Sequence, residues 1–242
     1  MRRTLFISDL HLDETRRHVT QAFLEFLQRE AVACDALYIL GDLFEAWIGD
    51  DDHSELNKEI ITALASLTGG GVPTYIMHGN RDFLIGKQFC RAAGCELLAD
   101  PSVIDFYGQT TLLMHGDSLC TSDAEYMAFR AKIRDPATQQ QLMSKPLAER
   151  RQIAAELRAG SASANSNKAE DIMDVTTSEV VQQMQHYHSR RLIHGHTHRP
   201  SRHTVALEDG VAQRIVLGDW GTKLWYVDLR PEQLDLVQQP IR

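Results

Sequence analysis

The chain repeats short apolar runs, each followed at once by small or polar residues. Residues 4–7, 36–40 and 74–77 are three such runs of strand length near the N-terminus. Continuous apolar runs of this length are typical of strands buried on both faces of a parallel sheet. They predict three neighbouring strands, each with a polar loop at its carboxyl end.

Helical patterns separate these runs. Val19, Phe23, Phe26 and Leu27 recur at helical spacing and predict an amphipathic helix that covers the sheet. A second helix is expected over about residues 55–67, where the glycines and proline of residues 69–73 end it. Strands that alternate with helices indicate an α/β fold.

Beyond residue 100 the pattern changes to strand pairs. Residues 103–106 and 110–114 flank a turn at Tyr107 and Gly108 and predict a hairpin. Further strands are expected at residues 192–193, 203–207, 215–217 and 224–228. These runs predict a second sheet packed on the first, with flanking helices and with the loops of both sheets at one edge.

A helical insertion of about residues 120–187 interrupts this pattern. Within residues 121–170, eight basic and six acidic side chains give a charge of +2, against −8 for the whole chain. A locally basic, amphipathic segment suggests a lid or a surface that meets anionic lipid. Helices packed on the core with solvated arginines explain the pattern equally well. We expect one domain over residues 1–242 with this insertion inside it.

Length and composition exclude several classes of protein. At 242 residues the chain can bury one core and carry an insertion. The net charge of −8 disfavours nonspecific binding to nucleic acid. The four cysteines lack metal or redox spacing and are expected to be reduced thiols of a cytoplasmic protein. No signal peptide or membrane span is evident, so we expect a soluble protein that at most rests on a membrane surface.

Side chains that can bind metal ions follow five of the strand-like runs. They are Asp9 and His11; Asp42 after Gly41; Asn80, Arg81 and Asp82 after Gly79; His115 and Asp117 around Gly116; and His194, His196 and His198 around Gly195 and Thr197. In open α/β sheets ligands bind at the carboxyl ends of the strands. Oxygen and imidazole ligands suit Mn²⁺, Fe²⁺, Zn²⁺ or Mg²⁺, and we expect Mn²⁺ on ligand hardness. Two ions bridged by Asp42 would lower the pKa of a bridging water, and Arg81 could clamp a phosphate group.

Each cluster alone also has an ordinary explanation as a turn or a helix cap, but five in succession favour a site with two metal ions. Other polar residues near these clusters are expected to have structural roles. His194 and His78 are interpreted as packing histidines, and Asp82 and Asp117 as carboxylates that orient ligand imidazoles or Arg81. Residues 50–52, three aspartates, are interpreted as a solvated loop.

The five clusters resemble the signature of the calcineurin-like metallophosphoesterase superfamily. This resemblance implies a four-layer αββα sandwich and hydrolysis of phosphate esters or anhydrides at a dinuclear metal centre. One metal ion would be held by Asp9, His11, Asp42 and His198, and the other by Asp42, Asn80, His115 and His196. Many members have a histidine as proton donor at the position of Arg81, so the resemblance leaves the general acid unassigned. From the residues themselves we expect catalytic roles for Asp42, which would bridge the two ions, and for Arg81, which would stabilise charge on the phosphate.

Longer stretches, including residues 40–52, 79–84, 115–121, 172–175 and 192–200, are similar to one family, the UDP-2,3-diacylglucosamine diphosphatases of lipid A biosynthesis. This resemblance implies attack at the α-phosphorus of UDP-2,3-diacylglucosamine, releasing UMP and 2,3-diacylglucosamine 1-phosphate (lipid X). It also implies two Mn²⁺ ions per chain and a peripheral position at the cytoplasmic side of the inner membrane. An obligate protein partner is not evident.

The substrate-binding residues implied by this family are Asn80, Arg81, Asp123, Ser161, Asn165, Lys168 and His196. The spacing of Ser161, Asn165 and Lys168 places them on one face if that stretch is helical. Apolar residues of the insertion, Tyr126, Phe129 and Leu142, are candidates to shelter acyl chains.

Two other functions remain open from the residues. A sibling metallophosphoesterase, such as a cyclic nucleotide phosphodiesterase or a dinucleoside polyphosphate hydrolase, would have the same ligands, although a basic amphipathic insertion is awkward for small soluble nucleotides. A noncatalytic scaffold with this fold would usually have lost some metal ligands, whereas all seven are present here.

Overall fold

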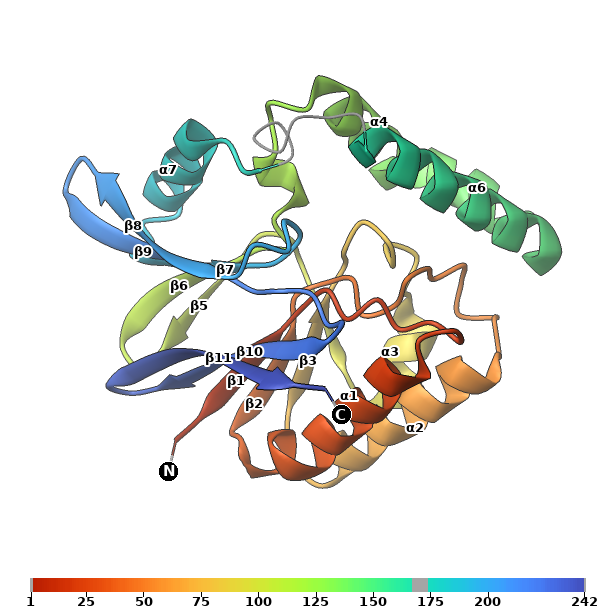
Figure 1. Cartoon of the computed structure of the whole chain (residues 1–242), viewed down its shortest axis with the longest axis horizontal. Helices are drawn as coiled ribbons and strands as arrows, with labels where there is room; N and C mark the ends of the chain where they lie inside the picture. The colour runs from red at the N-terminus through yellow and green to blue at the C-terminus, as the bar shows by residue number, and fades with distance from the viewer. Residues whose placement is uncertain (1, 167–173, 242) are drawn as a thin grey trace.

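The computed structural model describes residues 2–166 and 174–241, with side chains described throughout these ranges except at 161–166. Two mixed β-sheets pack face to face in this part of the chain, and helices cover their outer surfaces (Figure 1). A separate group of helices stands over the edge where the strand-end loops meet (Figure 1).

The first sheet has the order β11-β10-β1-β2-β3-β4. Its strands are β1 (Thr4–Ile7), β2 (Ala36–Ile39), β3 (Thr74–Met77), β4 (Glu96–Leu98), β10 (Lys223–Arg230) and β11 (Gln233–Pro240). Strands β1 to β4 are parallel, and β10 joins β1 antiparallel. The carboxyl ends of β1, β2 and β3 therefore meet at one edge.

The second sheet has the order β5-β6-β7-β9-β8. Its strands are β5 (Ser102–Phe106), β6 (Gln109–Leu113), β7 (Arg191–His194), β8 (Ser201–Leu207) and β9 (Gly210–Val216). Strands β6 and β7 are parallel neighbours, so the loops after them leave the sheet on the same side.

Alternating side chains fill the layers on either side of the first sheet. Leu5 and Ile7 pack with α1 (Arg17–Arg29), α2 (Glu55–Gly69) and α3 (Lys87–Ala93), whereas Phe6 packs between the two sheets. On the outer face of the second sheet, α7 (Thr177–His186) contributes Val180 and Met184 to a third cluster. The expected four-layer αββα sandwich is therefore confirmed.

Each predicted strand and helix has a counterpart, but α3, β4 and β11 were not predicted. Strand β11 is an edge strand that pairs with β10 through its whole length, and apolar and polar residues alternate only over residues 233–236. Only this antiparallel pairing makes residues 233–240 a strand, because the stretch carries few apolar residues.

The helices over the edge of the sandwich are α4 (Ala124–Arg134), α5 (Pro136–Met143) and α6 (Leu147–Ser166), which we call the lid. Arginines of the lid pair with carboxylates of the sandwich, Arg150 in a buried position and Arg151 in an exposed one. Arg150 contacts Asp51, at 2.8 Å from Nη1, and Arg151 contacts Asp52 at 2.9 Å. Opposite charge therefore holds the lid on the acidic body.

The interpretation of residues 50–52 as a solvated loop was correct only in part: they form a loop in which Asp51 is half exposed, but all three carboxylates have structural partners. Asp50 accepts hydrogen bonds from the backbone N–H groups of Gly86, Gln88 and Phe89 and so caps α3. Asp51 and Asp52 carry the ion pairs to the lid. The pairing residues lie far apart in sequence, so no local pattern could reveal them.

All four cysteines are free thiols. Within residues 2–166 and 174–241 there is no helix that combines the length and the apolar character needed to cross a bilayer.

Candidate metal centre

The loops after the strands hold their polar side chains in an unusual backbone conformation. Seven described residues other than glycine have positive φ angles, and five of them are Asp9, His11, Asp42, His196 and His198. Left-handed backbone is costly for such residues and persists where the surrounding structure enforces it, which is common at functional sites. Five of the seven predicted ligands therefore lie in strained backbone at one edge.

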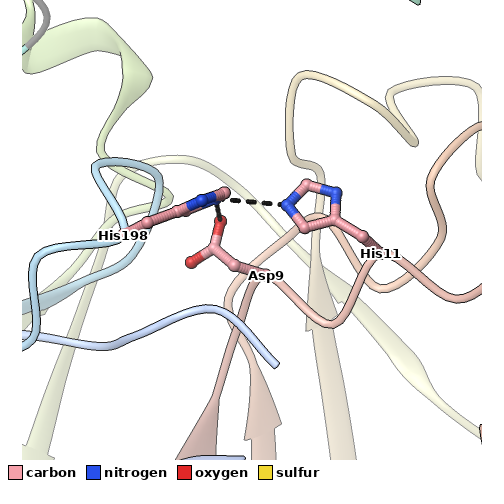
Figure 2. A group of neighbouring side chains, drawn as sticks. All are labelled: Asp9, His11 and His198. Atoms are coloured by element: carbon pink, nitrogen blue, oxygen red, sulfur yellow. Dashed lines mark hydrogen bonds and ion pairs between the residues drawn. The ribbon is translucent and has the colours of Figure 1, made fainter. Parts of the chain in front are cut away.

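Two groups of these side chains converge. Ligand atoms of Asp9, His11 and His198 lie within 4.8 Å of one another, as do those of Asp9, Asp42 and His115. In the first group, His198 Nε2 lies 3.2 Å from His11 Nε2 and 3.5 Å from Asp9 Oδ1 (Figure 2). The three side chains come from the loops after β1 and β7 and point toward one shared space (Figure 2).

Asp42, a member of the second group, also approaches a histidine of the first. Its Oδ2 is 3.9 Å from His11 Nε2 and 3.8 Å from His115 Nε2. Its Oδ1 accepts a hydrogen bond from the backbone N–H of Arg81 at 2.8 Å. One carboxylate oxygen is thus held by backbone while the other faces both sets of imidazoles.

Glycine allows this close approach. A Cβ at Gly79 would lie 2.1 Å from Asp42 Oδ1, and one at Gly195 would lie 2.2 Å from Asp9 Oδ2. A side chain at either position would displace a ligand carboxylate. Glycine is therefore required at these two positions because the ligand carboxylates pack against its backbone.

A second set of ligand atoms surrounds the amide oxygen of Asn80. His115 Nε2 lies 3.0 Å and His196 Nδ1 2.9 Å from Asn80 Oδ1. His115 Nδ1 donates to the backbone oxygen of Leu40 at 2.9 Å, so its neutral form presents the Nε2 lone pair to the amide oxygen. A metal ion bound here would take the place of the Nε2 proton and have both the imidazole nitrogen and the amide oxygen as ligands.

The pKa of His115 agrees with a cation site. Burial disfavours its protonation, but the charges of Asp42, Asp117 and Asp9 outweigh burial and raise the pKa to about 9. Burial and the neighbouring His115 instead lower the pKa of His196 to about 3. The donor set of carboxylate oxygens, an amide oxygen and imidazoles, without thiolate, fits divalent metal ions.

Glu45 is a contributor that the sequence analysis missed. Its Oε2 lies 3.1 Å from His11 Nδ1, on the far side of the imidazole from Nε2. A carboxylate in this place fixes the orientation of a ligand histidine. The same side chain lies 3.9 Å from the guanidinium of Arg81.

Asp82 has a different role from the one suggested by the sequence. It is fully buried and accepts hydrogen bonds from the backbone N–H groups of Gly79 and Leu43, both at 2.8 Å. It therefore ties together the two loops that carry Asn80 and Asp42. It orients backbone rather than an imidazole or Arg81.

Asp117 faces the lid. Its Oδ2 accepts hydrogen bonds from Arg130 Nε at 2.8 Å and from the Tyr126 hydroxyl at 3.1 Å. Arg134 of the same helix donates to the backbone oxygen of Gly79 at 2.9 Å. The lid thus contacts the loops that carry Asn80 and His115 directly.

The two histidines interpreted as packing residues lie outside the ligand groups. His194 is buried in β7, where its Nδ1 lies 2.9 Å from the Gly195 oxygen. His78 Nε2 lies 2.7 Å from the Ile85 oxygen.

The predicted substrate-binding residues fall into two sets. Asn80, Arg81, Asp123 and His196 all line the pocket over the metal ligands, of about 240 Å³. Residues 161 and 165 lie on α6, but their side chains and the whole of Lys168 fall outside the described part of the structure.

A cavity of about 350 Å³ adjoins this pocket, and Asn80, Arg81, Asp123 and Tyr126 line both. Apolar side chains dominate its remaining walls. The lid contributes Phe129, Leu142, Ile153 and Leu157, and the sandwich contributes Trp47, Ile48, Phe83 and Leu84. The three residues proposed from the sequence to shelter acyl chains, Tyr126, Phe129 and Leu142, thus line one cavity.

Fold and ligand set together define a metallophosphoesterase. The profile of the calcineurin-like phosphoesterases matches residues 2–200, and the chain belongs to that family.

Relatives with much higher similarity carry one shared name. The chain is 51% identical over 239 residues to a UDP-2,3-diacylglucosamine hydrolase of Marinobacter nauticus, covering 98% of each chain. It is 51% identical over 238 residues to the protein of the same name from Salmonella paratyphi B, covering 98% of this chain and 99% of the relative. Among solved structures, an archaeal phosphodiesterase aligns over 98% of this chain and 99% of its own, at 11% identity and a TM-score of 0.49.

Proposed function

We propose that the protein hydrolyses the diphosphate bond of UDP-2,3-diacylglucosamine, as a step of lipid A biosynthesis. The products are UMP and 2,3-diacylglucosamine 1-phosphate. The observation that carries this proposal is the direct connection between the metal pocket and the apolar cavity beneath the lid. A lipid substrate whose phosphate group lies at the metal ligands can place its acyl chains in that cavity. The 51% identity to hydrolases named for this substrate supports the same conclusion.

The site residues divide into two metal-binding sets that share Asp42. Asp9, His11, Asp42 and His198 would hold one ion, and Asp42, Asn80, His115 and His196 the other, with Mn²⁺ as the proposed ion in both. Two bound ions would supply an activated water and neutralise charge on the phosphate oxygens.

The protein's own groups orient the substrate around these ions. The guanidinium of Arg81, which borders both the metal pocket and the apolar cavity, would bind oxygens of the α-phosphate as its charge develops. One carboxylate oxygen of Asp42 accepts a hydrogen bond from the backbone N–H of Arg81, and this contact fixes the position of the metal ligand Asp42 relative to Arg81. Attack at the α-phosphorus leaves UMP on one side and the acylated sugar phosphate on the other.

The sugar and its phosphate would be held by Asn80, Arg81, Asp123 and His196, together with Ser161 and Asn165 of α6 and Lys168. The proposed location is the cytoplasmic face of the inner membrane, from which the acyl chains can enter the cavity. Phe129 and Leu157 are partly exposed beside this cavity, which suits a peripheral contact with lipid.

The test is a product assay with purified protein, Mn²⁺ and UDP-2,3-diacylglucosamine in detergent micelles. We expect UMP release that a chelator abolishes. If simple phosphodiesters are hydrolysed but UMP is not released, the protein is a metal-dependent phosphoesterase and the lipid substrate is rejected.

Replacing the central carboxylate tests the metal assignment. In the Asp42→Ala variant we expect turnover and the binding of two metal ions to be lost together, because both groups lose a shared ligand. Activity falls below about 1% of the parent, given the several kcal/mol that such ions supply. Asp209→Ala, which removes an exposed carboxylate from the turn between β8 and β9, is the matched control. Retained activity in Asp42→Ala would reject the proposed centre.

A further inference from the structure

A cavity of about 270 Å³ also adjoins the metal pocket, through Thr197 and Arg199, which line both. It shares no lining residue with the apolar cavity beneath the lid. The two cavities therefore open from different walls of the metal pocket. We call this second cavity the basic pocket.

The basic pocket is built on the outer face of the second sheet. Ser201 and His203 of β8 lie directly opposite Val216 and Arg214 of β9, and residues opposite each other share a face. All four line the pocket.

Further along the same face, Val205 and Ala212 pack with Val180 and Met184 of α7. Helix α7 thus covers one part of this face, and the basic pocket lies on the part nearer the metal ligands.

Hydrogen-bond donors point to an acceptor-rich ligand. Arg214 Nη1 and Thr197 Oγ1 are buried and have no hydrogen-bond partner among the described residues. An unsatisfied buried donor costs stability that a bound acceptor would recover. Burial also lowers the pKa of Arg214, although the charge of Asp174 opposes this effect.

The charged side chains of the pocket suit a ligand rich in hydrogen-bond acceptors. Arg199 and Arg214 both line it, and Asp174 contacts Arg199 at 3.1 Å. The volume is slightly below the range of about 300–1,000 Å³ for drug-sized ligands, so it suits one part of a larger substrate.

We propose that the basic pocket binds the uridine end of the UMP half of the substrate, with Arg214 and Thr197 donating hydrogen bonds to it, while the α-phosphate stays at the metal ligands beside Arg199, which lines both pockets. This inference rests on the proposed function, whose substrate joins a lipid and a nucleotide through the diphosphate at the metal ligands. Uridine offers carbonyl and hydroxyl oxygens to these donors. The acylated sugar occupies the lid side and the nucleotide the β8–β9 side, so the two products leave by separate walls.

Two arginines, Arg214 in β9 and Arg190 just before β7, give a matched test. Arg214 lines the pocket, whereas Arg190 lies outside it, pairs with Asp209 and also has a buried nitrogen without a hydrogen bond. Arg214→Met should weaken UMP binding to the Mn²⁺-loaded protein by about 10-fold or more, the usual effect of losing a charged hydrogen bond. Binding of 2,3-diacylglucosamine 1-phosphate should stay within about twofold, and Arg190→Met should change neither product. Calorimetric titration with each product measures these affinities.

A second variant does not depend on the folding of Arg214→Met. His203 is exposed and opposite Arg214, so His203→Asp should fold, place a carboxylate at the mouth of the pocket and weaken UMP binding in the same selective way. Unchanged UMP affinity in both variants, or equal loss of both products, would overturn the inference.

The parent protein separates this inference from the proposed function. If the parent releases UMP from the lipid substrate while both variants bind UMP normally, only the basic pocket is rejected. If the parent binds UMP through Arg214 but does not cleave the lipid, the pocket stands and the lipid substrate is rejected.

Discussion

At the level of single residues, backbone groups hold the ligand side chains of the metal centre in place. Asp42 accepts from the N–H of Arg81, Asp9 accepts from the N–H of His196, and His115 contacts the oxygen of Leu40. These contacts join loops from both sheets. The ligand atoms are therefore pre-positioned by the fold, which lowers the cost of ordering them when an ion binds.

The raised pKa of His115 makes metal binding depend on pH. Its metal-free pKa of about 9 means that the imidazole is protonated at pH 7.5, and an ion must displace that proton. We expect release of about one proton per protein at pH 7.5 and an affinity that rises about tenfold per pH unit up to about pH 9. Metal titrations by calorimetry in two buffers of different ionisation enthalpy measure the proton. An identical heat in both buffers would contradict the expectation.

Asp100 destabilises the protein at neutral pH. Burial and the charge of Asp117 raise its pKa from 3.8 to about 6, and its Oδ2 has no hydrogen-bond partner among the described residues. The folded state therefore favours the neutral carboxyl, a contribution that is complete below about pH 4 and lost as the pH rises through 6.

Asp100→Asn should accordingly stabilise the protein more at pH 8 than at pH 4. The gain in unfolding free energy over the parent should be about 2–3 kcal/mol larger at the higher pH. Urea unfolding at the two pH values measures this difference. Asp209→Asn, at an exposed position, is the control. An equal gain at both pH values would mean that Asp100 is ionised throughout.

At the level of elements, α6 is attached to the sandwich by one buried arginine. Arg150 is 4% exposed, and its guanidinium contacts Asp51 and the backbone oxygen of Ile48. Arg151, the next residue, is 61% exposed and contacts only Asp52 among the described side chains. Exposed pairs contribute little, whereas a buried guanidinium with several acceptors contributes more.

We therefore expect Arg150→Met to loosen the lid and Arg151→Met to leave it unchanged. Amide hydrogen exchange over residues 147–160 should accelerate by about tenfold or more in the first variant, with β1 to β3 unaffected. Exchange measured by mass spectrometry resolves the two regions. Equal protection of the lid in both variants would show that other contacts hold α6.

At the level of the whole molecule, the apolar cavity exists only where the lid meets the sandwich. Phe129 and Leu157 come from the lid, and Trp47 and Phe83 come from loops of the sandwich. Neither part alone encloses the space. A lipid in the cavity would therefore contact both parts of the chain.

Phe129→Asp should raise KM for the acylated substrate by about tenfold or more, since a charge would line an apolar wall, and should change KM for a deacylated analogue far less. Steady-state kinetics on the two substrates measure the difference. Val211→Asp, at a 68% exposed apolar residue of β9, controls for an added surface charge. Equal changes in KM for both substrates would show that Phe129 does not contact the acyl chains.

Much of the architecture could be predicted because its signals are local. The apolar runs at residues 4–7, 36–40 and 74–77 became β1, β2 and β3 with boundaries within one residue. The polar clusters follow strands, and parallel strands bring their carboxyl ends to one edge. The hydrophobic period and the order of the strands along the chain therefore determined the sandwich and brought the seven predicted ligands together.

Contacts between distant segments were decided only by the tertiary structure. Arg150 and Asp51 are 99 positions apart, and neither shows a pattern that selects the other. Glu45 beside His11 and Arg214 opposite His203 likewise have meaning only once the loops and strands are packed. Sequence period reports which face of an element is apolar, whereas the partner of a charged side chain depends on the whole fold.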